Sequence, residues 1–462
     1  MISALRERLR GARGDGARFV RYTSWNLVAV AVPIAVGLAA IPVLTRALGP
    51  ARFGLLALAW ALLEYLAVFD FGLSRATLRH VAQRRQAHDP SLAGTVTASL
   101  AAQTALGAAA GILLALLAPT IVARVLRVPP ELALEAHRAL LVLAATMPFV
   151  LLALGLRALL EAAERFDLAA RVRAPASSAT FAVPAIAAAA GATLPTILAL
   201  LLVVRVVTCA ASWAMVRRAL PTVAIGRPRE LASLRSLFGI GGWMAVSSLL
   251  TPVFLYWDRL ALGAVGGIVA VGLYAGAAEL TLRLLMVPAV VVGAVFPAAS
   301  ALAGSGDHGS LRRLHRRTGY ALFLLLLPVV VTLVVAAPQI IRVLLGDAYV
   351  ATGATVLRLL APGVLLSAVA HAPVAFLQAA GRADVSGRLH LAMALLHVAL
   401  VTALVVPFGA PGAAAAFTLR AVVDLAAVSW LARRYLPGGE AAREAPGGAD
   451  VVVAPPAAPS ID

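Results

Sequence analysis

The chain has 462 residues, of which 61% are hydrophobic and only 13% are charged, whereas a soluble domain usually carries about 25% charged residues. This deficit excludes an ordinary soluble enzyme, a disordered chain and a disulfide scaffold. The net charge of +18 comes from arginine alone, and the arginines lie in short clusters between long apolar segments, which is typical of a membrane protein with many spans and argues against nucleic acid as a partner.

Long apolar segments follow one another along the whole chain. Residues 1–22 contain six arginines and lack the short apolar region and cleavage site of a secretory signal, so we expect a basic N-terminus ahead of an uncleaved first helix. A spanning helix needs about 20 mostly apolar residues. The apolar segments lie at residues 27–44, 53–69, 92–118, 139–156, 174–204, 237–257, 264–302, 319–337, 352–377 and 389–419.

Three of these segments are too long for a single straight span. Residues 174–204 and 389–419 each hold glycine and proline near the middle, so each is predicted to form two helices joined by a tight turn. Residues 264–302 also hold Glu279 and Arg283. We expect this third segment to cross once, as far as about residue 288, and to continue as a kinked extension along the cytoplasmic surface. The sum is twelve spanning helices.

The distribution of arginine predicts the orientation. With the N-terminus inside, twelve spans place 28 arginines in cytoplasmic segments, eight on the opposite side and three within spans. Short cytoplasmic connections of membrane proteins are rich in basic residues. The asymmetry therefore supports the count of twelve and places both termini in the cytoplasm.

The predicted domain organisation is two lobes of six helices with short flanking segments. The C-terminal residues are rich in proline, glycine and alanine, a composition typical of disorder. The predicted parts are a cytoplasmic basic N-terminus at residues 1–22, an N-lobe at 23–218, a cytoplasmic linker at 219–236, a C-lobe at 237–436 and a disordered cytoplasmic tail at 437–462.

An internal repeat relates the two halves. Residues 158–171 resemble residues 375–388 without a gap, and an Arg-x-Asp-x-x-x-Arg frame that begins at Arg165 recurs 217 residues later at Arg382. Six helices per repeat give both halves the same orientation in the membrane. The fold class is therefore predicted to be an all-α polytopic membrane protein, with two six-helix lobes related by a pseudo-two-fold axis along the membrane normal.

Several short stretches, taken in order, resemble the polysaccharide flippases of the multidrug/oligosaccharidyl-lipid/polysaccharide exporter superfamily. They are Leu-Thr-Arg-Ala-Leu-Gly-Pro at residues 44–50, Phe-Gly at 53–54, Asp-Phe-Gly-Leu at 70–73, Glu-Arg-Phe-Asp at 164–167, Asp-Arg at 258–259, Leu-Gly at 262–263 and Val-Gly-Leu-Tyr at 271–274. The resemblance implies a twelve-helix, two-lobe transporter with a central cavity. It also implies export of undecaprenyl-linked sugar repeat units across the bacterial inner membrane.

The sequence holds no enzyme signature, so we expect a non-enzymatic protein without a cofactor. The phosphate-binding GxxxxGK[ST] loop and the HExxH and GxSxG motifs are all missing. His390 and His397 are seven residues apart on one helical face, but they lack a nearby carboxylate, so no metal site is predicted. Without a nucleotide site, transport must be driven by an ion gradient, the membrane potential or the substrate gradient.

Charged residues inside the spans are the candidate site residues. Arg205 and Arg420 lie about ten residues into the sixth and twelfth helices, where a charge is costly unless it faces water or the interior of the bundle. An arginine fork binds the oxygens of a pyrophosphate well. The alternative for Arg420 is an ion pair with Asp424, four residues further along the same helix.

The other candidates divide into a coupling group and a phosphate-guiding group. Glu279 and Arg283 are four residues apart and either neutralise each other or line the cavity. Glu64 has no basic residue within four positions and is a candidate proton carrier or a hydrogen-bonded structural residue. Arg46 and Arg259 are expected at the outer mouth, where they guide phosphate release or anchor the interface.

The function predicted from the sequence is a flippase for lipid-linked oligosaccharide that works by alternating access. The expected partners are that substrate and membrane lipid, and the further candidates are a proton or sodium ion, a polysaccharide polymerase and glycosyltransferases. The alternatives are a cation-coupled multidrug exporter, which needs an acidic or aromatic cavity, and a membrane scaffold or polymerase subunit, whose charges would pair locally.

Reporter fusions test the predicted topology. Fusions after residues 90 and 310 should report the cytoplasm, and a fusion after residue 130 should report the outside, because the arginine clusters fix these loops. An outside signal at residue 310 would contradict a single crossing by residues 264–302.

Overall fold

The computed structural model describes residues 2–66, 70, 72–87, 89, 91–221 and 242–436, and it gives only the backbone for residues 2–31, 66, 242–249 and 251. The predicted disordered tail at residues 437–462 lies outside these residues, as does most of the predicted linker at 219–236. The described residues form helices joined by short turns, with no β-strand among them.

The described residues of the first half form six α-helices and one π-helical turn. They are α1 (Ile2–Leu66), α2 (Leu73–Gln86), α3 (Leu92–Thr120), η2 (Ile121–Val125), α4 (Pro130–Ala162), α5 (Phe166–Ala189) and α6 (Leu194–Ala219). The second half contains α8 (Gly242–Leu282), η3 (Arg283–Leu285), α9 (Met286–Gly304), α10 (His308–Val335), α11 (Ala337–Leu345), η4 (Asp347–Tyr349), α12 (Val350–Ala379) and α13 (Ala383–Tyr435).

Three of the long helices turn back on themselves at a glycine. The backbone leaves the helical conformation at Gly49 in α1, at Gly267 in α8 and at Gly409 in α13. By length and composition, eight helical stretches of the described chain could cross a membrane, and several of them contain such a turn. Divided at the three glycines, these eight stretches become eleven, and α5, with 24 residues, is counted as the twelfth crossing of the described chain, so that each half has six.

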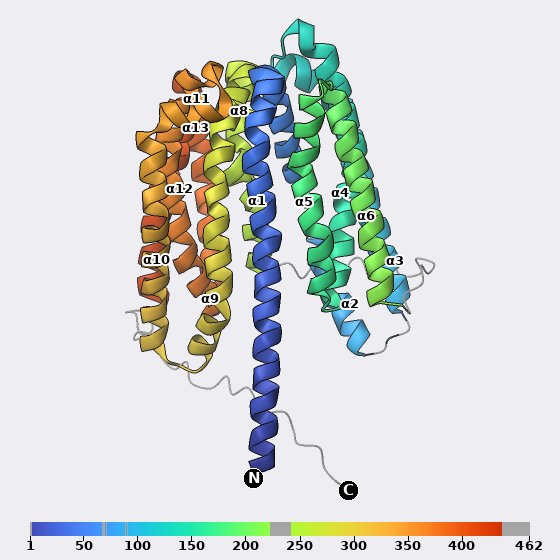
Figure 1. The fold of residues 1–462 in the computed structure, drawn as a ribbon, viewed down its shortest axis with the longest axis vertical. Helices are drawn as coiled ribbons and strands as arrows, with labels where there is room; N and C mark the ends of the chain where they lie inside the picture. Colours follow the sequence, from blue (N-terminus) through green and yellow to red (C-terminus); the bar gives the residue numbers. More distant parts are fainter. Residues whose placement is uncertain are drawn as a thin grey trace.

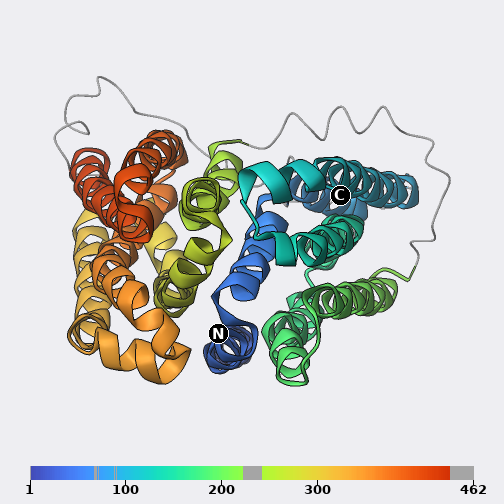
Figure 2. The ribbon, with the colours of Figure 1, turned by 90° about the horizontal axis from the view of Figure 1, so that it is seen from above.

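The crossings form two bundles that lie side by side. The N-lobe contains α1 to α6 and the C-lobe contains α8 to α13, and α1 and α8 pack against each other between the two bundles (Figures 1 and 2). The predicted fold class, an all-α membrane protein with two six-helix lobes, is confirmed.

Equivalent turns recur in the two lobes at a constant spacing. Gly49 (φ 67°, ψ 174°) and Gly267 (φ 72°, ψ −178°) have nearly the same backbone conformation 218 residues apart. Gly191 and Gly409 are also 218 residues apart, and both have positive φ. Glycine adopts positive φ without strain, so the internal repeat keeps glycine where each lobe reverses direction.

The repeated Arg-x-Asp frame forms the same local ion pair in each lobe. Arg165 binds Asp167 at 3.0 Å at the start of α5, and Arg382 binds Asp384 at 3.2 Å at the start of α13. An aspartate in the first turn of a helix is stabilised by the helix dipole. The frame found in the sequence therefore marks the beginning of the fifth helix of each lobe.

The course of the third long segment, residues 264–302, differs from the predicted extension along the cytoplasmic surface. Beyond Gly267 the chain runs as helix to Leu282, makes a single 3₁₀ turn and continues as α9 to Gly304. Instead of lying along a surface, α9 packs against α10 and α12 and runs parallel to α1 (Figure 1). The apolar residues of α9 bury one face against these neighbours, which a surface position would have left exposed to water.

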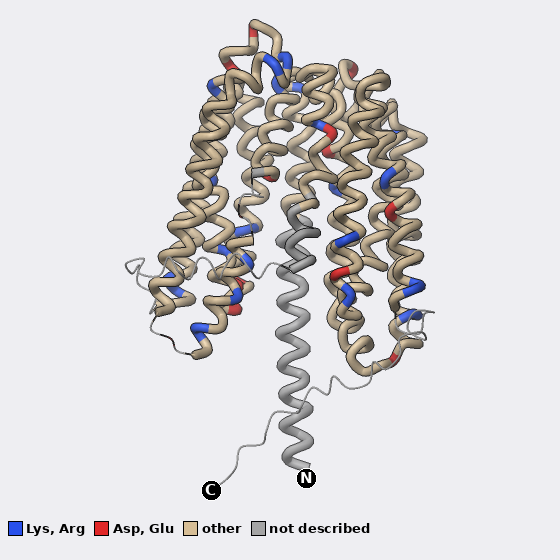
Figure 3. The backbone as a smooth tube through the Cα atoms, turned by 180° about the vertical axis from the view of Figure 1, so that it is seen from behind, with Lys and Arg blue, Asp and Glu red and all other residues tan. Residues whose placement is uncertain are grey.

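The two ends of the bundle differ in character. One end, called the basic end here, carries the N-terminus and the arginine-rich connections around residues 75–91, 163–173 and 305–317. Charged residues also occur partway along the helices (Figure 3). The opposite end carries the glycine turns, η2 and α11, and there the lobes approach each other most closely (Figure 1).

The lobes meet through backbone at the opposite end. A Cβ atom on Gly272 would lie 1.8 Å from the carbonyl oxygen of Pro50, and a Cβ atom on Gly54 would lie 2.3 Å from that of Ile268. Gly54 and Gly272 are again 218 residues apart, so equivalent positions of the two repeats touch each other. Small residues allow such a close approach of membrane helices.

We expect Gly272→Ala to destabilise the contact between the lobes by about 1–3 kcal/mol, the usual cost of overpacking. Thermal unfolding of the purified protein measures the change. The matched control is Gly319→Ala, because Gly319 lies within α10 and a methyl group added there would meet no neighbouring atom within 4 Å; this change should be neutral or stabilising. Equal stability of the two variants would contradict the interpretation.

Candidate binding cavity

A cavity of about 670 Å³ lies between the lobes and is lined by both of them. The N-lobe contributes residues of α1, α5 and α6, and the C-lobe contributes residues of α8, α9, α12 and α13. Sites for small ligands usually enclose about 300–1,000 Å³. The charged residues in its lining are Glu64, Arg205, Arg259, Glu279, Arg283, Arg420 and Asp424.

Seven of the eight predicted site residues therefore line one cavity, and Arg46 does not. Arg46 donates a hydrogen bond to the carbonyl oxygen of Val343 in α11. This bond joins the lobes at the opposite end, outside the cavity. Arg127 makes a similar connection there, with a 3.4 Å hydrogen bond to the carbonyl oxygen of Val265.

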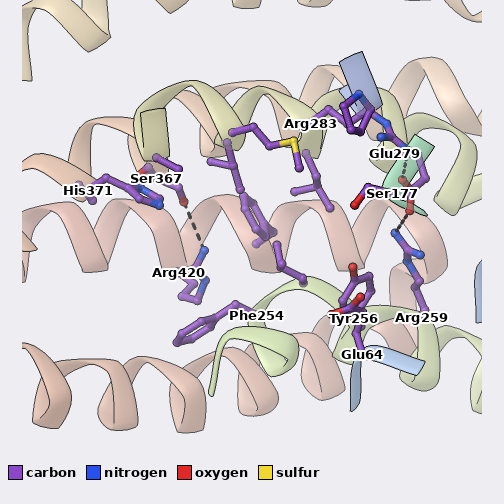
Figure 4. A pocket seen from close by; sticks show the side chains of 18 of the residues that line it. Glu64, Ser177, Phe254, Tyr256, Arg259, Glu279, Arg283, Ser367, His371 and Arg420 are labelled. Carbon is purple, nitrogen blue, oxygen red and sulfur yellow. Dashed lines mark hydrogen bonds and ion pairs between the residues drawn. The ribbon is translucent and has the colours of Figure 1, made fainter. Parts of the chain in front are cut away.

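Arg259, Glu279 and Arg283 form an ionic triad in the cavity wall. The Glu279 carboxylate accepts from Arg259 at 2.7 Å and from Arg283 at 3.0 Å (Figure 4). The sequence indicated only the pair within one helix and placed Arg259 at the outer mouth. That placement is wrong, because the helix continues beyond Arg259 to the turn at Gly267, so that Arg259 is only 1% exposed.

The triad belongs to the C-lobe but rests on the N-lobe. Arg259 Nη1 donates to the carbonyl oxygen of Ala57 at 3.2 Å, and the Arg283 guanidinium lies 4.2 Å from the ring centre of Phe181. Arg283 also fills the space beside Gly37, where a Cβ atom would lie 2.3 Å from Nη1. Glu279 thus holds two arginines in contact with the other lobe.

A second polar group lies in the C-lobe wall. Arg420 is 3.5 Å from Asp424 and donates to Ser367 at 3.3 Å, and it lies over the rings of Phe254 and Phe417 at 4.8 and 4.9 Å. His371 of α12 and His390 of α13 join this group. The sequence indicated His390 only as a member of a histidine pair without a metal role. It did not indicate His371, whose only signal is a polar residue within the apolar segment 352–377, which also contains Arg358 and Ser367.

Arg205 differs from the other three cavity arginines. No carboxylate of the described chain lies within 4.0 Å of its guanidinium, and the charge that acts on it most strongly is that of Glu64. Arg205 lies 11 residues beyond the first residue of α6, and Arg420 lies 11 residues beyond Gly409. The two arginines therefore lie at similar depths in the two lobes, with different surroundings.

The whole lining contains four arginines and three carboxylates. Three of the arginines have a carboxylate within 4.0 Å, and each of those three also lies over an aromatic ring. Aromatic rings stabilise cations over their faces by about 0.5–2 kcal/mol. The cavity can therefore keep three cations in place without a ligand and offers a fourth, Arg205, to an anion.

A family model described as "Polysaccharide biosynthesis protein" matches residues 43–354, well over half of the chain. The chain belongs to the polysaccharide biosynthesis protein family. A protein of Shigella flexneri named "Putative O-antigen transporter" is 28% identical to it over 417 residues, which cover 90% of this chain and 98% of that protein. The resemblance found in the short sequence stretches is confirmed.

Solved transporters share the fold of this polysaccharide biosynthesis family member. An inward-facing multidrug resistance MATE family transporter of the MOP superfamily superposes with a TM-score of 0.74 at 17% identity, covering 91% of this chain and 99% of that one. The lipid II flippase MurJ in an inward closed conformation gives 0.72 at 14% identity, covering 87% and 86%. An outward-facing MATE transporter gives 0.58 at 18% identity, covering 90% and 95%. All three have the fold of this chain over most of their length.

We expect Glu279→Gln to lower the free energy of unfolding by about 3 kcal/mol, because it removes the carboxylate that two buried arginines share. Thermal unfolding in detergent measures the loss. Arg205→Gln is the control, since Arg205 has no carboxylate within 4.0 Å in the described chain, and its unfolding temperature should change little. Similar losses in the two variants would show that pairing does not stabilise the triad.

Proposed function

We propose that the protein is a flippase that moves undecaprenyl-pyrophosphate-linked oligosaccharide repeat units across the bacterial inner membrane for the synthesis of surface polysaccharide. Family membership and the similarity to a protein named as an O-antigen transporter support a role in this pathway. The main observation in support of the proposal is that Arg205 lines the cavity between the two lobes without a carboxylate of the described chain within 4.0 Å.

The diphosphate of the substrate binds at Arg205. A guanidinium donates two parallel hydrogen bonds to phosphate oxygens, and it keeps its charge even when it is buried. The arginines of the triad are less available, because Glu279 already accepts from both at 2.7 and 3.0 Å. Arg205 therefore meets the phosphates first, and Glu64 faces it from the same lobe as the candidate carrier of a coupling ion.

Transport follows an alternating-access cycle. The basic end faces the cytoplasm, in agreement with the positive-inside rule, so both ends of the chain lie on the cytoplasmic side. Substrate enters between the lobes from that side. The lobes then rock against each other. The contacts that close the opposite end, namely the backbone contact at Gly54 and Gly272 and the hydrogen bond of Arg46, open to release the substrate.

A cation exporter fits the cavity less well. Such a transporter would need acidic groups or free aromatic faces for organic cations. Here arginines outnumber carboxylates, and arginine side chains lie over Phe181, Phe254 and Phe417. A scaffold without transport would need no cavity of this size.

Deletion of the gene tests the proposed function. We expect lipid-linked oligosaccharide to accumulate on the cytoplasmic face and the surface glycan to disappear, as measured by glycan staining and by accessibility of the lipid-linked sugar to an added lectin. Normal surface glycan together with altered sensitivity to cationic drugs would favour the exporter instead.

Complementation of that deletion tests the role of Arg205. Arg205→Ala should abolish export while the protein remains folded and inserted, because the diphosphate loses its cation. Arg205→Lys should restore only part of the export, since an ammonium keeps the charge but not the planar fork. The control is Arg342→Ala, because the Arg342 side chain is 64% exposed and pairs with Asp347 away from the cavity. Normal export by Arg205→Ala would rule the assignment out.

A further inference from the structure

The polar groups of the cavity lie in two separate places. Figure 4 shows Arg420, Ser367 and His371 at one end of the view and the triad at the other, with apolar side chains between them. The first group, together with His390 and Asp424, all from α12 and α13, is called the C-lobe cluster here. The proposed role of Arg205 makes no use of this cluster.

The C-lobe cluster has little net charge to offer an anion. Arg420 and Asp424 are 3.5 Å apart and neutralise each other, and both are at most 7% exposed. The Arg420 guanidinium is further engaged by Ser367 and by the rings of Phe254 and Phe417. A doubly charged diphosphate would therefore gain more beside Arg205 than beside this pair.

The hydrogen-bonding capacity of the cluster is nevertheless not used up. Arg420 Nε, Asp424 Oδ1 and His390 Nδ1 are buried and have no hydrogen-bond partner in the described chain. The first is a donor, the second is an acceptor and the third is either, depending on its tautomer. Buried polar groups are normally paired, so a ligand that satisfies the cluster must both donate and accept.

This requirement selects among the chemical groups of the substrate. A diphosphate only accepts and would leave Asp424 unsatisfied, whereas a metal or organic cation would be repelled by Arg420. A sugar hydroxyl both donates and accepts. Ala370 and Val374 lie beside the cluster in the same lining and present apolar surface to the carbon–hydrogen face of a sugar ring.

We propose that the C-lobe cluster is a subsite for the neutral hydroxyl groups of the glycan. The substrate then lies across the cavity, with its diphosphate on the N-lobe at Arg205 and its sugars on the C-lobe at Asp424 and His390. This inference rests on the proposed flippase function and adds the direction in which the substrate is held. Small rotations of the Asp424 and Arg420 side chains bring their unpaired atoms to the bound sugar.

Binding of two lipids to the purified full-length protein in lipid nanodiscs tests the subsite. One lipid is undecaprenyl pyrophosphate, which lacks sugar, and the other is undecaprenyl-pyrophosphate-linked oligosaccharide extracted from a strain without the protein. Asp424→Asn and His390→Ala should each weaken binding of the glycosylated lipid relative to the sugar-free lipid by about tenfold, the effect of one lost hydrogen bond. Binding of the sugar-free lipid should be unchanged in His390→Ala and should not fall in Asp424→Asn, because the latter change removes the counter-charge of Arg420. Arg205→Ala should weaken binding of both lipids.

The controls separate failure of the subsite from failure of the proposed function. His390→Ala leaves the Arg420–Asp424 ion pair in place, so it still tests the subsite if Asp424→Asn fails to fold. Ser305→Ala at an exposed turn should leave both affinities unchanged. Equal losses for the two lipids, or unchanged binding of the glycosylated lipid in both variants, would overturn the subsite while leaving the flippase intact. Binding of neither lipid by the unaltered protein would overturn the proposed function itself, and the subsite with it.

Discussion

An ionised side chain inside a bilayer costs from about 3 to over 10 kcal/mol unless it is paired or hydrated. Seven such side chains line the cavity between the lobes, and Asp258 is buried in α8 next to Arg259. This cost limits how the helices can be arranged. The seven lining residues face a common interior rather than lipid. An arrangement that enclosed no cavity would have to bury every one of them in close pairs.

The charged side chains are paired differently in the two lobes, so the two walls of the cavity have different roles. In the C-lobe wall, Glu279 and Asp424 each lie within 3.5 Å of an arginine, so every arginine of this wall is paired and the wall is stable without a ligand. In the N-lobe wall, Arg205 and Glu64 lie further apart, and both can respond to an arriving charge. The repeated architecture therefore does not make the binding surface symmetric.

Much of the fold could be predicted because its signals are local. Apolar length marked the crossings, glycine and proline marked the reversals near Gly191 and Gly409, and the frame at Arg165 and Arg382 marked the repeat. Local signals could not indicate partners from distant segments. The contacts of Arg259 with Ala57 and Glu279 depend on how α8 packs on α1, and the direction of α9 depends on α10 and α12.

The contact between Gly54 and Gly272 has a consequence for how such a molecule can arise. In a pair of identical subunits, a residue on the two-fold axis touches its own copy. Positions 54 and 272 are such copies within one chain, so a dimer of a six-helix ancestor would have formed this contact with a single glycine. In a single chain each repeat carries its own glycine, and a larger residue in either one is enough to force the helices apart. The two repeats can therefore differ around the binding surface, but both must keep a glycine at this contact.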